Sequence, residues 1–291
     1  MTSPNSHAEA RLALARKLGA GYAANPKAAV VMASGSSGRG SADRFSDLEL
    51  DVYWREPPTA EERRHAALAG GAEAVEVYPY EEEEWAEDLR VGDFHIGTST
   101  FLVRTMEKYI GLVATARDGA PLAQIRLSAL LHARLLSGDA ALVESWRERA
   151  AAYPDHLAGV MLRLNLGFEG FGAAEDALAA RDDVVLLYDT VTRVERQVLG
   201  ALLGLNRVYL PNPGFKHVAE LIDEFTHKPA DLLARLKSAY RLPPAEGVAA
   251  LHGVIADVFD LVDRHARGFD TRPYRERVAQ RRPVWDNLPA G

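Results

Sequence analysis

Residues 31–53, VMASGSSGRGSADRFSDLELDVY, place a loop of small residues between two apolar runs. The second run carries acids at Asp47, Glu49 and Asp51, which alternate with aliphatic residues. Because successive side chains of a strand point to opposite faces, the acids share one face and the aliphatic residues share the other. Carboxylates held side by side need cations, so this row beside a Gly/Ser loop indicates divalent metal and a phosphate-bearing ligand. A half-exposed sheet with a wet polar face is the alternative that the alternation leaves open.

The loop between Ser34 and Ser41 contains three glycines and four serines. This composition lets the backbone approach a ligand closely. The loop lacks the Lys-Ser/Thr pair of a Walker A motif, and its glycines do not follow the G-x-G-x-x-G spacing of a dinucleotide site. The sequence therefore argues against both of these phosphate-binding classes.

A Gly-Ser pair is followed here by a basic residue, a glycine and Ser-Asp-x-Glu. These positions are Gly35, Ser36, Arg39, Gly40, Ser46, Asp47 and Glu49. The segment resembles the signature of the DNA polymerase beta-like nucleotidyltransferase superfamily, in which a strand ends in Gly-Ser and the next strand carries Ser-Asp-x-Asp/Glu. Most members have Asp where this chain has Glu49. Some antibiotic-modifying members use Asp-x-Glu, so the chain is most similar to that small aminoglycoside- and lincosamide-type branch.

The resemblance implies magnesium-dependent transfer of a nucleoside monophosphate, with ATP as the expected donor and pyrophosphate as the leaving group. Gly35, Ser36 and Arg39 are then expected to bind the triphosphate. Asp47 and Glu49 are expected to bind two magnesium ions, the usual arrangement of a two-metal mechanism. The expected acceptor is a hydroxyl group of a small antibiotic-like molecule.

A third carboxylate is expected at Asp93, in the run GDFHIGTSTF at 92–101. Asp93, His95 and Gly97 share one face of this predicted strand. By resemblance, Asp93 acts as a metal ligand, as a general base or as both. The alternative is a turn residue, because Gly92-Asp93 also fits a hairpin connection. His95 fits either a proton relay or a structural histidine.

The segment LNRVYLPNPGFKH at 205–217 carries a further candidate. An ordinary turn between two helices is enough to explain its prolines and glycine. A similar pattern in small nucleotidyltransferases with helical C-terminal halves implies that Lys216 contacts the triphosphate, where a helix N-terminus also attracts anions.

The chain is expected to be an α+β protein with two domains. Residues 1–117 are expected to form a nucleotidyltransferase domain, a mixed sheet with helices on one side, and residues 118–291 a helical domain that lines the cleft. The expected strands are 28–34, 47–54, and further strands within 72–100. From residue 118 the pattern predicts only helices, at 121–136, 140–152, 155–167, 170–180, 184–206, 215–225, 229–241 and 246–266.

Composition limits the possible functions. The chain has no cysteine, which excludes disulfides, thiolate zinc sites and cysteine nucleophiles. It has no apolar run long enough to span a membrane, so a cytoplasmic protein without a membrane partner is expected. The 41 acids outnumber the 34 bases, and the net charge of −7 argues against broad nucleic-acid binding and slightly favours a small cationic acceptor.

The acidic run Glu81–Glu84 precedes Trp85. It is expected to be a solvated surface, or else to line a pocket for a polycationic sugar. Two other functional classes stay open. One is a toxin-like nucleotidyltransferase that modifies a tRNA or a protein, and the other is a non-catalytic nucleotide-binding module of the same fold.

Overall fold

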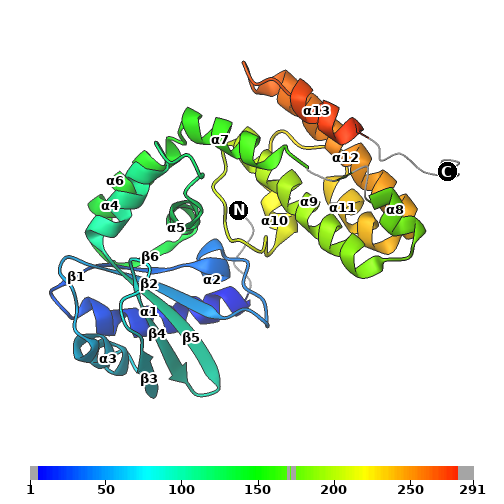
Figure 1. Cartoon of the computed structure of the whole chain (residues 1–291). Helices are drawn as coiled ribbons and strands as arrows, with labels where there is room; N and C mark the ends of the chain where they lie inside the picture. Colours follow the sequence, from blue (N-terminus) through cyan, green and yellow to red (C-terminus); the bar gives the residue numbers. More distant parts are fainter. Residues whose placement is uncertain (1–5, 169–170, 172–174, 281–291) are drawn as a thin grey trace, which may run out of the picture. The chain divides into compact units, whose positions relative to one another are not determined.

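The computed structural model describes residues 6–168, 171 and 175–280. The chain forms two compact units. The first comprises the residues up to Ala114 together with Leu122–Ala152, and the second comprises Thr115–Pro121 together with the residues from Tyr153 onward. Figure 1 traces both units along the chain, from the blue N-terminal helix to the red C-terminal one.

The first unit is built on a six-stranded sheet with the strand order β3-β4-β5-β2-β1-β6. The strands are β1 (Ala28–Ala33), β2 (Leu48–Trp54), β3 (Ala74–Val77), β4 (Trp85–Val91), β5 (Phe94–Leu102) and β6 (Arg134–Gly138). Strands β2 and β5 run parallel, whereas the other neighbours are antiparallel. The predicted mixed sheet and the α+β class are confirmed.

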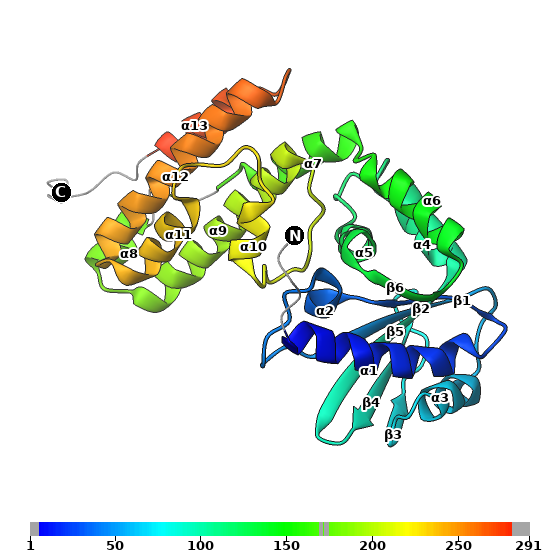
Figure 2. The ribbon, with the colours of Figure 1, turned by 180° about the vertical axis from the view of Figure 1, so that it is seen from behind.

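Helices cover both faces of this sheet, as Figure 2 shows from behind. The helices of this unit are α1 (Ser6–Ala23), α2 (Gly35–Arg39), α3 (Ala60–Ala69), α4 (Val103–Leu112), α5 (Pro121–His132) and α6 (Ala140–Ala151). On one face, Leu18 of α1 packs in a core with Leu50 and Val52 of β2. On the other face, the Tyr53 ring centroid lies 5.1 Å from that of Trp146 on α6. The expectation of helices on one side was wrong, because Val52 and Tyr53 are both buried although they point to opposite faces.

The prediction of only helices after residue 118 was wrong, because residues Arg134–Gly138 form strand β6. It pairs antiparallel with β1, and the Asp139 N–H that follows it donates to the Ala29 carbonyl oxygen at 2.9 Å. This pairing places residues 122–152 with the sheet, so the compact units divide differently from the expected boundary at 117 and 118. Hydropathy alone does not separate a short apolar strand from the last turn of a preceding helix.

A buried ion pair fastens α3 to the sheet. The Arg63 guanidinium and the Glu87 carboxylate are 2.6 Å apart, and their side chains are 3% and 0% exposed. The Thr100 hydroxyl donates to the second Glu87 oxygen at 2.9 Å, and Arg63 also donates to the Tyr78 carbonyl oxygen at 3.0 Å. These additional hydrogen bonds offset part of the large cost of removing both charges from water.

The second unit is helical throughout its described residues, as expected for the C-terminal half. Its helices are α7 (Asp155–Asn165), α8 (Glu175–Ala180), α9 (Val184–Asn206), α10 (Val218–Asp223), α11 (Leu232–Arg241), α12 (Pro244–His265) and α13 (Arg272–Ala279). The long helices α9 and α12 bury Val194, Val198, Val254 and Val258 completely. The predicted start of a helix at residue 170 lies outside the described residues.

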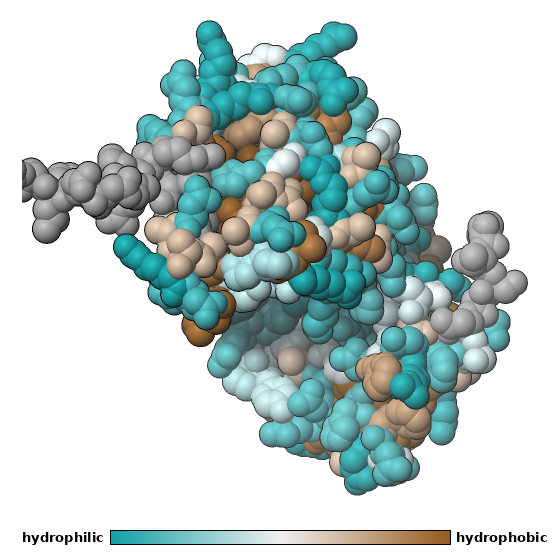
Figure 3. Space-filling model, turned by 90° about the vertical axis from the view of Figure 1, so that its right-hand side faces the viewer, coloured by the Kyte–Doolittle hydropathy of each residue, from teal (hydrophilic) through white to brown (hydrophobic). Residues whose placement is uncertain are grey.

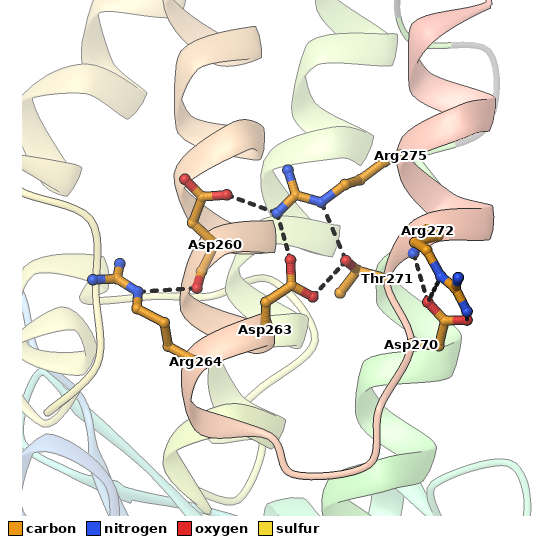
Figure 4. Close-up of polar contacts among 7 residues, drawn as sticks. All are labelled: Asp260, Asp263, Arg264, Asp270, Thr271, Arg272 and Arg275. Atoms are coloured by element: carbon orange, nitrogen blue, oxygen red, sulfur yellow. Dashed lines mark hydrogen bonds and ion pairs between the residues drawn. The ribbon is translucent and has the colours of Figure 1, made fainter.

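Helix α13 is attached to α12 through charged side chains (Figure 4). The Arg275 guanidinium lies 2.7 Å from a carboxylate oxygen of Asp260 and 2.7 Å from one of Asp263. The Thr271 hydroxyl donates to the other Asp263 oxygen at 2.6 Å. Arg275 therefore links α13 to two acidic side chains of α12, and the chain from residue 281 lies outside the described residues.

The surface mixes apolar and polar residues. On the face drawn in Figure 3, hydrophobic residues occur singly or in small groups among hydrophilic ones. Among the residues that the structure describes, no helix combines the length and the apolar character needed to cross a bilayer.

The Arg63–Glu87 pair yields a stability prediction. Arg63→Met leaves the Glu87 carboxylate buried without its cation, and we expect a loss of about 3–5 kcal/mol in the free energy of unfolding. Urea unfolding followed by circular dichroism measures this loss. The control is Arg64→Met, which removes an exposed pair with Glu61 on the same helix and is expected to cost less than about 1 kcal/mol. Equal losses in the two variants would contradict the assigned role of the buried pair.

Candidate active site

The Gly/Ser loop continues directly from β1 into the short helix α2. Gly35 opens α2 with a φ of +59°, and Gly40 closes it with a φ of +79°. Glycine adopts this left-handed conformation without strain, which explains its presence at both ends of so short a helix. The Ser34 N–H donates to the Glu49 carbonyl oxygen at 3.1 Å and so joins the loop to β2.

The Gly35 turn and the second acid of the motif are in direct contact. A Cβ atom built at Gly35 would lie only 2.6 Å from Oε2 of Glu49. No side chain fits there unless the carboxylate moves. The sequence motif therefore corresponds to a physical junction, in which the Glu49 carboxylate lies against the backbone of the turn.

The acids of β2, together with Asp47 just before it, form the polar face that the alternation predicted. Asp47 and Glu49 are exposed, whereas Leu48 and Leu50 are buried on the opposite face. Asp51 lies on the acidic face too, but it is only 4% exposed. A wet surface therefore accounts for the outer two acids alone, and it does not account for Asp51.

Burial raises the pKa of Asp51 to about 6. Arg126 on α5 lowers this pKa, the neighbouring Glu49 charge raises it, and a hydrogen bond with Ser34 lowers it. A carboxyl group that titrates this close to neutrality beside a phosphate-type loop is a candidate functional group. Sequence reasoning placed Asp51 in the acidic row but gave it no role, although its position two residues after Glu49 was the available signal.

The segment just before β2 is held in place from α1. The Arg11 side chain donates to the Ser46 carbonyl oxygen through Nε at 2.9 Å and through Nη2 at 2.6 Å. The Ser46 hydroxyl accepts from the Asp43 N–H at 2.9 Å and donates to the Asp43 carboxylate at 3.0 Å. Ser46 thus shapes the turn that delivers Asp47.

Ser36 and Arg39 are half-buried on α2, the helix that the resemblance assigns to phosphate binding. Arg134 of β6 supports the end of this helix, because its Nε donates to the Gly38 carbonyl oxygen at 3.1 Å. Sequence reasoning missed Arg134. It gave no signal, because the strand that carries it was expected to be helical.

The acidic run Glu81–Glu84 forms a tight turn. Glu82 and Glu83 have φ values of 50° and 71°, and the backbones of Glu81 and Glu84 exchange hydrogen bonds of 2.9 and 3.0 Å. Glu83 forms an ion pair with Lys108 at 2.8 Å, and Glu84 forms one with Arg126. Two of the four acids are therefore paired with cations from α4 and α5. This pairing favours a structural role over a pocket for polycations.

Asp93 lies in the turn between β4 and β5, where it is exposed. Gly92 adopts a φ of +57° beside it, and Val91 pairs with Phe94 across the turn. This is the hairpin connection that the sequence left open as the alternative. His95 is exposed on β5, where its register partner on β4 is Arg90.

Strand β5 carries no acid opposite the acids of β2. In the parallel register, Glu49 pairs with Gly97 and Asp51 pairs with Ser99. A Cβ atom built at Gly97 would meet no other atom within 4 Å. The position beside Glu49 is therefore open space rather than a third ligand.

The structure does not bring Asp93 together with Asp47 and Glu49 in a three-ligand group. Within the described ranges, no group of three or more His, Asp or Glu side chains lies close enough to hold a metal ion. Two exposed carboxylates nevertheless fit magnesium that arrives on a triphosphate, because Mg²⁺ commonly uses one or two protein carboxylates together with phosphate oxygens and water. The role of Asp93 stays a prediction.

Lys216 belongs to the helical unit, where it is exposed in the turn before α10. Its backbone N–H donates to Oδ1 of Asn212 at 2.9 Å, a hydrogen bond typical of an ordinary turn. Its expected contact with a triphosphate stays a prediction.

No protein-family model matches the chain, and no curated protein matches it. Among solved structures, the chain is similar to a nucleotidyltransferase-like protein from Exiguobacterium sibiricum 255-15, with a TM-score of 0.42 and 11% sequence identity. The alignment covers 87% of this chain and 74% of that chain. A TM-score this low carries no argument about the site, so the roles of its residues depend on geometry and on the motif.

The Gly35–Glu49 junction can be tested with a matched pair of glycine substitutions. Gly35→Ala combines a positive φ with a clash against the Glu49 carboxylate, and we expect it to lower the free energy of unfolding by about 1–3 kcal/mol. Gly97→Ala enters open space on the neighbouring strand, and we expect it to be close to neutral. Thermal and urea unfolding measure both effects. A neutral Gly35→Ala variant would show that the junction is loose.

The raised pKa of Asp51 predicts a pH dependence. Because the folded state holds this proton more tightly than the unfolded state, stability should fall as the pH rises from about 4 to about 6. Asp51→Asn should remove this part of the fall and raise the free energy of unfolding at pH 7 by up to about 3 kcal/mol. Unfolding curves between pH 4 and 8 provide the test, with Asp88→Asn on the same face as the control. An unchanged pH profile in Asp51→Asn would contradict the assignment.

Proposed function

We propose that the chain is a nucleotidyltransferase that transfers a nucleoside monophosphate, with ATP as the donor, to a hydroxyl group of a small molecule. One observation carries this proposal. The Glu49 carboxylate lies against the Gly35 backbone, so the phosphate-type turn and the acidic strand form one continuous surface. This junction joins the two parts of the motif that the sequence resembles.

In this proposal the chain supplies a cradle for the triphosphate and ligands for its metal. Ser36 and Arg39 bind the β and γ phosphates, and Asp47 and Glu49 hold magnesium, for which two ions are expected. Bound magnesium supplies neutralisation of phosphate charge and a lower pKa for the acceptor hydroxyl. Lys216 enters as a further phosphate contact on the resemblance alone.

The acceptor side of the proposal depends on fewer observations. The antibiotic-like acceptor comes from the branch with Asp-x-Glu, and Asp93 enters as metal ligand or base from the resemblance alone. Among the acids of this face, Asp51 has a shifted pKa, which burial raises to about 6. With 96% of its surface covered, Asp51 suits a positioning role beneath Glu49 better than contact with a bulky acceptor.

A second candidate, a non-catalytic module that binds nucleotide, is favoured by one specific observation. The β5 positions that pair with Glu49 and Asp51 are Gly97 and Ser99, so β5 offers no carboxylate there. Two acids are enough to bind a magnesium nucleotide, whereas activation of an acceptor hydroxyl also needs a base within reach.

Pyrophosphate release tests the proposed activity. The full chain is incubated with magnesium, each of the four nucleoside triphosphates and a panel of hydroxylated acceptors that includes aminoglycosides, lincosamides and tRNA. Asp47→Asn should lower turnover by at least about a hundredfold, because it removes a charged metal ligand. The control is Asp88→Asn. Asp88 is an exposed acid on β4 that pairs with Gly97 of β5, and its replacement should leave turnover unchanged.

Calorimetric titration with magnesium ATP separates the two candidates. Binding that needs Asp47, without pyrophosphate release for any acceptor, would support the module and overturn the transferase. Turnover that survives Asp47→Asn would refute the assigned site. Asp93→Asn decides the third acid, because a ligand or base at that position predicts a loss of turnover without a loss of nucleotide binding.

A further inference from the structure

The helical unit contains a pocket of about 810 Å³ between α7, α9 and the loop at 207–217. Its size falls in the range of small-molecule sites. Met161, Leu210 and Phe215 give it an apolar lining, and the polar lining comes mainly from α9. All of its lining residues belong to the second unit, so the pocket shares no residue with the Gly35–Glu49 junction.

Two arginines face this pocket from α9. Arg193 and Arg196 lie on adjacent turns of the helix and both contribute to the lining, whereas Asp189 is the acid among the lining residues. Arg196 makes no hydrogen bond or ion pair within the part of the chain that the structure describes, whereas Arg193 already takes part in another interaction. The pocket thus has a positive balance in a protein with a net charge of −7. A guanidinium at a concave surface is a preferred partner for planar anionic groups.

An aromatic wall of the pocket is held in position from behind. The Tyr188 ring stacks on the Tyr240 ring with centroids 5.8 Å apart. The Tyr240 hydroxyl donates to Glu195 at 3.0 Å and lies 3.0 Å from the Thr192 hydroxyl. Because these contacts fix Tyr240, they also limit the movement of the Tyr188 ring that lines the pocket.

One polar atom at the pocket has no protein partner. The side-chain carbonyl oxygen of Gln197 is buried without a hydrogen bond to any described residue. Leaving such an acceptor unpaired costs about 1–3 kcal/mol, so a ligand donor or a bridging water is expected to satisfy it. Asn165 also lines the pocket, with its amide nitrogen donating to the Met161 carbonyl oxygen at 2.8 Å.

We propose that this pocket binds a small organic anion, with a flat apolar body against Tyr188 and Phe215 and one anionic group at Arg193 and Arg196. The inference does not depend on the proposed nucleotidyltransferase activity. It assigns the opposite charge to the ligand of this pocket from the cationic acceptor that the overall composition favoured.

Two dyes of the same shape test the proposal on the full chain. The anionic probe is 8-anilinonaphthalene-1-sulfonate, and its matched neutral probe is N-phenyl-1-naphthylamine, which lacks the sulfonate. Fluorescence titration should show tighter binding of the sulfonate, with affinity that falls as salt rises. The double variant Arg193→Gln/Arg196→Gln should weaken sulfonate binding by about tenfold or more and leave the neutral dye unchanged.

Two further variants fix the location. Arg241→Gln changes an exposed arginine of α11 outside the pocket lining and should bind both dyes like the wild type. Leu210→Trp narrows the pocket at its apolar lining and should weaken the binding of both dyes. Equal affinity for the two dyes, no effect of the double variant, or wild-type affinity for both dyes in Leu210→Trp would each overturn the proposal. Circular dichroism of every variant confirms that the helices are intact.

Discussion

The antiparallel register of β1 and β2 is the constraint on which the candidate site depends. Ala33 pairs with Leu50, so the chain leaves β1 with the Ser34 N–H directed at the Glu49 carbonyl oxygen, 3.1 Å away. A slip of one residue would turn every acid of β2 into the core. The register therefore decides at once which side chains are buried and which acid meets the Gly35 backbone.

The solvent exposure of the carboxylates decreases along the acidic face. At its outer end Asp47 and Glu49 are open to solvent, and at its inner end Asp51 is buried near Arg126. The Arg126 guanidinium also forms an ion pair with Glu84 and lies 4.7 Å from the Phe101 ring centroid. One cation on α5 thus links β2, β5 and the turn before β4. The carboxylates that it does not neutralise, Asp47 and Glu49, lie at the exposed end.

The sequence predicted the features that depend on local pattern. The alternation from Asp47 to Asp51 predicted the strand and its two faces, and the run of small residues predicted the break after β1, although not the short helix α2 within it. The sequence did not predict the features that depend on which strands pair with each other. Strand β6 exists because β1 offers it an edge, and Arg134 reaches α2 only through that pairing. The environment of Asp93 likewise depends on the hairpin between β4 and β5, since a face-sharing argument does not say where a strand begins.

Gly97 has a consequence for how this fold can change over time. It lies beside Glu49 in the parallel register, and the space above its Cα is unfilled. An acidic residue introduced at that point would enter without displacing a neighbour and would stand next to an existing carboxylate. One substitution there therefore adds a carboxylate beside Glu49 without rebuilding the sheet, so single steps in ancestry or in laboratory evolution can change the number of acids on this face.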